Sequence, residues 1–118
     1  MDVGFLIPEE KRPKWFSYDD SFIFFARNNI VTMLPLRFLD AEGQIANKRY
    51  IFEKFKVDCV PFCIDGGLDE FFCWIEIEDN LRCIRCPFDS DEFTIIEYYS
   101  DFWEFMKHVV DRMKEHMD

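Results

Sequence analysis

The sequence has no hydrophobic run long enough to cross a membrane. Its longest apolar stretches are the five residues Phe22–Ala26 and the segment Ile30–Leu36, which Thr32 and Pro35 interrupt. A transmembrane helix needs about 20 consecutive apolar residues. The N-terminus also lacks the basic start and the long apolar centre of a secretory signal peptide. We therefore predict no membrane partner and a cytoplasmic location.

Positive charge is almost missing from residues 65–104, which contain twelve acids and only two bases, Arg82 and Arg85. The rest of the chain is balanced, so this block accounts for the whole formal net charge of −10. Proteins contact nucleic acids and anionic membranes through Lys and Arg, so no nucleic-acid partner is predicted. The acidic block favours a basic protein partner, with improved solubility of a phenylalanine-rich chain as the alternative.

Histidine is also scarce, and nothing singles out one pair among the 24 acids for acid–base catalysis. Histidine occurs only at His108 and His116, with no neighbouring Cys or Ser to act as a nucleophile. The segment Asp65–Glu70 places three carboxylates around two glycines, but it lacks the ligand order of an EF-hand and the Gly-Lys-Ser/Thr of a phosphate loop. It predicts a hairpin turn, with a partner-binding loop as the alternative. We predict no catalytic residue and no cofactor.

The five cysteines are an odd number, and without a signal peptide they indicate free thiols. Cys59 and Cys63, with Cys83 and Cys86, have spacings similar to those of zinc half-sites. In a strand, however, Cys59 and Cys63 would share one face about 13 Å apart, too far for one ion with ligand bonds of about 2.3 Å. Cys83 and Cys86 would point to opposite faces. We expect structural thiols and no metal.

Aromatic residues are abundant, with fifteen Phe, four Tyr and three Trp. Helical spacing predicts helices over Tyr18–Asn28, capped by Ser17, over 44–56 after a turn at 40–43, and over Asp101–His116, capped by Ser100. Short apolar runs between turn residues predict strands over Thr32–Leu39, Val57–Ile64, Glu70–Ile77, Leu81–Pro87 and Glu92–Tyr98. The order predicts an α+β fold in which a single antiparallel sheet of about four to five strands packs against helices. Six aromatics are assigned to its core: Phe71, Phe72, Trp74, Phe102, Trp103 and Phe105.

Four stretches resemble blocks of the SUKH superfamily, the fold of the yeast cell-wall-synthesis regulators and of many bacterial immunity proteins. They are Ser17–Asn29 (SYDDSFIFFARNN), Val60–Phe62 (VPF), Asp65–Cys73 (DGGLDEFFC) and Tyr99–Met106 (YSDFWEFM). The length of the chain and its lack of linkers predict one domain over residues 1–118, and the resemblance covers roughly residues 17–113 of it. An irregular segment over residues 1–16 is expected where the family commonly has an additional helix. The resemblance also implies a domain without catalytic residues that binds a protein, which in bacterial members is typically a cognate toxin and often a nuclease.

The expected function is therefore that of a non-enzymatic immunity protein, favoured as a monomer, that neutralises a basic toxin domain through an acidic surface. A regulatory or scaffold module that binds a different protein is the first alternative. An enzyme or metal protein built on the carboxylates or cysteines is the second. The expected contact residues are acids that project from the ends of the sheet: Asp65, Asp69, Glu70, Asp79, Asp89, Asp91 and Glu92.

Overall fold

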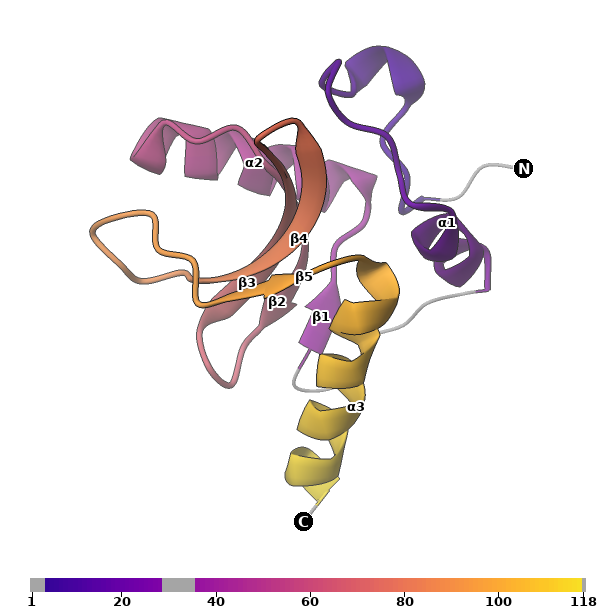
Figure 1. The fold of residues 1–118 in the computed structure, drawn as a ribbon, viewed down its shortest axis with the longest axis vertical. Helices are drawn as coiled ribbons and strands as arrows, with labels where there is room; N and C mark the ends of the chain where they lie inside the picture. Colours follow the sequence, from indigo (N-terminus) through magenta and orange to yellow (C-terminus); the bar gives the residue numbers. More distant parts are fainter. Residues whose placement is uncertain (1–3, 29–35, 118) are drawn as a thin grey trace.

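A computed structural model describes residues 4–28 and 36–117 of the chain (Figure 1). Within these residues, five strands form one antiparallel sheet in the order β1-β2-β3-β4-β5. The predicted α+β class with a single antiparallel sheet is confirmed. The elements in chain order are the 3-10 helix η1 (Glu9–Lys11), α1 (Asp20–Arg27), β1 (Leu36–Phe38), α2 (Ala41–Phe55), β2 (Val60–Asp65), β3 (Glu70–Ile77), β4 (Asn80–Pro87), β5 (Glu97–Tyr99) and α3 (Phe102–Met117).

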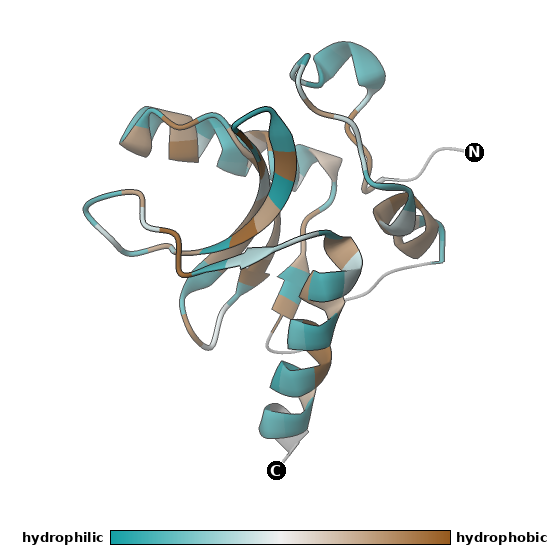
Figure 2. Ribbon diagram, viewed as in Figure 1, coloured by the Kyte–Doolittle hydropathy of each residue, from teal (hydrophilic) through white to brown (hydrophobic). Residues whose placement is uncertain are grey.

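The sheet separates two hydrophobic layers, because successive side chains of a strand point to opposite faces. On β3, Phe72 and Trp74 pack in the layer formed with α1, α3 and the N-terminal segment, whereas Phe71 and Cys73 pack in the layer beneath α2. Trp74 is central to the first layer, and its ring centroid lies 4.2 Å from that of Phe62 on β2. Figure 2 shows the hydrophobic colours concentrated on the strands and the hydrophilic colours along η1 and much of α3. None of the described helices is both long enough and apolar enough to span a membrane.

Aspartates cap the three α-helices, and at α1 and α3 they take the place of the predicted caps Ser17 and Ser100. The carboxylate of Asp19 accepts a hydrogen bond from the Ser21 amide at 2.8 Å, so α1 starts two residues later than expected. Asp40 accepts from the Gly43 amide at 2.8 Å, so the predicted turn at 40–43 is the cap and first turn of α2. Asp101 accepts from the Glu104 amide at 2.9 Å at the start of α3. The positive end of the helix dipole also favours an acidic residue at the cap.

β3 and β4 agree closely with the predicted strands, whereas β1, β2 and β5 differ in their bounds. β3 has the predicted bounds, and β4 begins one residue early at Asn80. β2 begins at Val60 rather than Val57, and β5 runs from Glu97 to Tyr99 rather than from Glu92 to Tyr98. β1 covers Leu36–Phe38, and residues 32–35 of the predicted strand lie outside the described residues. β2 also differs although it is hydrogen-bonded on both sides, so a central position alone does not fix where a strand begins.

The N-terminal segment, expected to be irregular up to residue 16, contains one turn of 3-10 helix and packs on the core. Ile7 is fully buried in the first hydrophobic layer. Gln44 of α2 is also fully buried, and its Nε2 donates hydrogen bonds to the carbonyls of Phe5 at 2.7 Å and Leu39 at 3.0 Å. The Tyr18 hydroxyl donates to Gln44 Oε1, and burial raises the pKa of Tyr18 to about 12. These bonds fix the segment against α2.

The assignment of Trp103 to the core is wrong, because its side chain is 53% exposed. Phe102 and Val109 of α3 are buried against the sheet. Each residue turns a helix by about 100°, so Trp103, one position after Phe102, points away from the buried stripe. The other aromatics assigned to the core are buried: Phe71, Phe72, Trp74, Phe102 and Phe105.

Candidate protein-binding surface

The antiparallel order of the strands brings two acidic loops together. The β2–β3 turn and the β4–β5 connection lie at the same end of the sheet, where the Phe88 amide donates a hydrogen bond of 2.9 Å to the Asp69 carbonyl. Four of the predicted contact residues are exposed on these loops. We refer to them as the acidic end: Asp69, Asp89, Asp91 and Glu92.

Asp79 lies at the opposite end of the sheet and does not join the acidic end. Figure 1 shows the β3–β4 turn at the top of the sheet, away from the β2–β3 turn. The eight residues of β3 separate the two ends by about 23 Å, at roughly 3.3 Å per residue. Glu78 and Asp79 have φ angles of 51° and 66° between the paired residues Ile77 and Asn80, which is the pattern of a type I′ hairpin turn.

Asp65 was predicted to project from the sheet, but its side chain is fully buried. Arg112 of α3 donates to it from Nε at 2.8 Å and from Nη2 at 3.3 Å. The amides of Gly67 and Leu68 also donate to its Oδ1, at 2.9 and 3.2 Å. Burial alone would raise the pKa of Asp65, but the hydrogen bonds from Arg112 and these amides lower it below its ordinary value. Asp65 is therefore a structural anion that a partner cannot reach.

Glu70 is also held in an ion pair rather than presented to solvent. Arg85 of β4 donates to it from Nε at 2.7 Å, and the Glu70 side chain is only 12% exposed. The same guanidinium contacts Glu97 of β5 at 3.2 Å, and its hydrogen bonds to Glu70 raise the pKa of Arg85. The carboxylate of Glu70 is thus already neutralised within the fold, and the acidic end excludes it.

These ion pairs lie on the face of the sheet that α3 covers. Asp65 is opposite Glu70 in the register, Arg85 is opposite Glu97, and Arg85 reaches Glu70 diagonally because its own partner on β3 is Phe72. His108 of α3 packs on the same face, with its ring centroid 5.3 Å from that of Phe72. Its Nε2 is buried and has no hydrogen-bond partner among the described residues. Burial, and then the nearby Arg85 charge, lower the pKa of His108 below its ordinary value. The Asp65–Arg112 ion pair joins α3 to this face of the sheet.

Exposed apolar residues accompany the acidic end, and these were not predicted. Leu68 in the β2–β3 turn and Ile96 in the β4–β5 connection are 44% and 45% exposed. Tyr98 on the edge strand β5 is also about half exposed. Protein interfaces combine exposed apolar and tyrosine side chains with a polar rim. The exposure of Tyr98 could have been predicted from the alternation along β5, because Tyr98 lies between two residues that face α3.

All five cysteines are free and buried, but their distribution differs from prediction. Cys59 packs beneath α2 and Cys63 in the opposite layer, because a bulge between Pro61 and Cys63 shifts the register of β2. Cys83 and Cys86 lie on opposite faces, as predicted. The described residues contain no group of three or more His, Cys, Asp or Glu side chains positioned for a metal ion. Burial raises the pKa of Cys63 and Cys83, which keeps these thiols protonated.

Comparisons with known proteins found no matching family model, no similar curated protein and no similar solved structure. Membership of the SUKH superfamily therefore stays a prediction from the four sequence stretches.

Proposed function

We propose that the protein is a non-enzymatic binding domain that captures a basic protein partner on its acidic end. The observation that supports this proposal is a cluster of exposed carboxylates on two adjacent loops, none of which forms a salt bridge among the described residues. Lys54 of α2 reaches these loops, but it donates to the Phe88 carbonyl rather than to a carboxylate. Residues 66–69 and 88–96 contain no Lys, Arg or His, so the four exposed carboxylates have no cation within their own loops. Clustered like charge destabilises a compact state by self-repulsion, which favours a functional reason for its presence.

A basic toxin domain is the partner class that we propose. The resemblance to SUKH immunity proteins implies such a partner, and a nuclease is a suitable example because it binds phosphates with Lys and Arg. Carboxylates of the acidic end would compete with phosphates for those cations. Leu68 and Ile96, exposed on the same loops, would supply the apolar contacts that charge alone does not provide.

The test reverses the charge of the acidic end and measures association. The partner is the toxin-domain product of a neighbouring gene or, where there is none, a protein captured from the native cytosol and then purified. In the reversed variant, each of the four carboxylates is replaced: Asp69→Lys, Asp89→Lys, Asp91→Lys and Glu92→Lys. The matched control makes the same change of charge at exposed acids elsewhere: Glu9→Lys, Glu53→Lys, Glu76→Lys and Asp111→Lys.

The association rate of the native protein should fall as salt is raised, because salt screens charges beyond a Debye length of about 10 Å at 0.1 M. The reversed variant should associate about tenfold more slowly or worse and lose this salt dependence. The control variant should keep most of the native rate. If the reversed variant associates at the native rate with the native salt dependence, the acidic end only maintains solubility and the proposal is wrong.

A further inference from the structure

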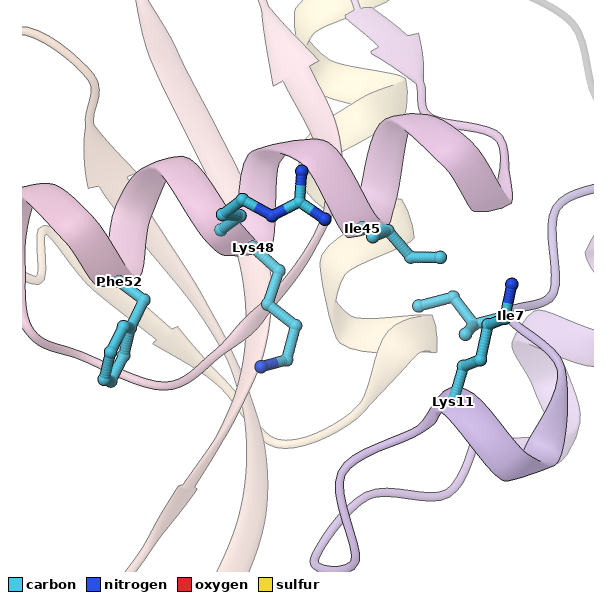
Figure 3. Close-up of a pocket in the computed structure, with 6 residues that line it drawn as sticks. Ile7, Lys11, Ile45, Lys48 and Phe52 are labelled. Atoms are coloured by element: carbon cyan, nitrogen blue, oxygen red, sulfur yellow. The ribbon is translucent and has the colours of Figure 1, made fainter.

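A groove of opposite charge lies between the N-terminal segment and α2. It has a volume of about 470 Å³ and is shown in Figure 3. Its lining combines three cations with three apolar side chains: Ile7, Lys11, Ile45, Lys48, Arg49 and Phe52. In a chain with a formal net charge of −10, a cationic groove is a distinct surface from the acidic end.

The groove follows from the sequence of α2. Ile45, Lys48, Arg49 and Phe52 have the spacing i, i+3, i+4 and i+7, which places them on one face of a helix. The sheet does not cover this face, because α2 buries Ile51 against it and Phe52 is left 49% exposed. This helix face has cations in its middle and an apolar residue at each end, so it suits a ligand that has both anionic and apolar groups.

The three cations of the groove are not equivalent. Lys48 contacts Asp58 at 2.6 Å, and the indole of Trp15 donates to the same carboxylate at 2.8 Å. Lys48 is therefore positioned and partly neutralised by the fold. No salt bridge involves Lys11 or Arg49 within the part of the chain that the structure describes. These two exposed cations, on opposite walls of the groove, are the ones that an anionic ligand would pair with.

We propose that this groove binds an acidic peptide segment of a partner protein, with the pattern apolar–acidic–acidic–apolar. Figure 3 shows Ile7 and Ile45 at one end of the groove, Lys48 in the middle and Phe52 at the other end. Seven residues of helix place Ile45 and Phe52 about 10.5 Å apart along the axis. In a polyproline II segment, residues i and i+3 lie on the same side about 9 Å apart, so two apolar residues match the two ends.

The charges of such a peptide also match the groove. Polyproline II has three residues per turn, so the two acidic residues between the apolar anchors point to the two other sides of the peptide. One side faces Lys11 on the η1 wall and the other faces Arg49 on the α2 wall. The proposal does not depend on the function of the acidic end, because the two surfaces have opposite charges and different residues.

Nuclear magnetic resonance of the ¹⁵N-labelled protein gives both the location and the strength of binding. The probe is the synthetic peptide acetyl-Gly-Leu-Glu-Asp-Phe-Gly-amide. Two comparison peptides replace Glu-Asp by Gln-Asn, which removes the charge, and Leu and Phe by Gly, which removes the anchors. The groove variant is Lys11→Glu with Arg49→Glu, and the milder variant is Arg49→Gln. The matched charge control is Lys107→Glu with Lys114→Glu on the exposed side of α3.

The amides around Lys11 and Arg49 should shift on addition of the probe peptide, and both comparison peptides should bind about tenfold more weakly or worse. The groove variant should lose about tenfold or more in affinity, Arg49→Gln should show a smaller loss, and the control should bind as the native protein does. The variant with four lysines at the acidic end should also keep peptide binding, which separates this proposal from the proposed function. Absence of shifts in the groove, equal binding of the uncharged peptide, or occupation of the groove by a second copy of the protein would each overturn the proposal.

Discussion

Replacing Asp65 with alanine is expected to destabilise the protein strongly, because this buried carboxylate joins three parts of the fold. It ends β2, accepts the amides of Gly67 and Leu68 in the following turn, and pairs with Arg112 of α3. Alanine removes every one of these acceptors and leaves the Arg112 guanidinium, which is only 15% exposed, without its main partner.

The size of the effect follows from these contacts. Breaking a buried ion pair by removing one partner costs about 3–5 kcal/mol. Arg112 keeps a second contact with Glu115 at 2.9 Å, so we expect a loss near the lower end, about 3 kcal/mol. Asp65→Asn keeps one acceptor oxygen for the turn amides and should lose about 1 kcal/mol less, the net value of a hydrogen bond. Either loss is a large part of the 5–15 kcal/mol, roughly, that stabilises a domain.

Urea unfolding followed by tryptophan fluorescence measures these free energies. The control is Asp69→Asn in the same turn, which should change stability by less than about 0.5 kcal/mol, because Asp69 is exposed with a φ of 58° that Asn tolerates well. Asp65→Asn combined with Arg112→Leu should cost less than the sum of the two single changes, since the double variant leaves no unpaired buried charge. A free energy of unfolding for Asp65→Ala equal to that of the native protein would refute the buried ion pair.

Three further predictions concern stability. Trp74→Ala should lower the free energy of unfolding by about 3–5 kcal/mol, because it truncates a buried aromatic side chain. Trp103→Ala should lower it by about 1 kcal/mol or less, because the Trp103 side chain is 53% exposed. Equal losses in urea unfolding would contradict the orientation of α3. Replacing Glu78 by Asn and Asp79 by Gly should raise the melting temperature, because these residues suit the positive φ angles of a type I′ turn, and a lower melting temperature would contradict that geometry. Burial lowers the folded-state pKa of His108 below its ordinary value of 6.5, so its contribution to stability is present above that pH and is lost as the pH falls below it. The urea midpoint should therefore drop more between about pH 7.5 and 5.5 in the native protein than in His108→Phe. Equal drops would show that the pKa of His108 does not change on folding.

Local patterns in the sequence were sufficient to predict the α+β class, the single antiparallel sheet and the bounds of β3. The alternation along β3 depends only on residues within the strand, and turn residues at both of its ends mark where it stops. The same local reasoning correctly assigned Phe72 and Trp74 to the core. It misjudged Trp103, because aromatic character was given more weight than the helical period of its neighbours.

Only the tertiary structure decided which carboxylates form a surface. Asp65 and Asp69 are the same residue type four positions apart, yet one is buried against Arg112, 47 residues away, and the other is exposed. Asp69 joins Asp89 because an antiparallel sheet returns alternate loops to the same end, and the sequence separation of the two residues does not show this. The cationic groove likewise requires the N-terminal segment to pack beside α2. Ion pairs and grooves are formed by residues that are distant in the chain. Only the fold brings these residues together, so the sequence alone does not show the surfaces that they form.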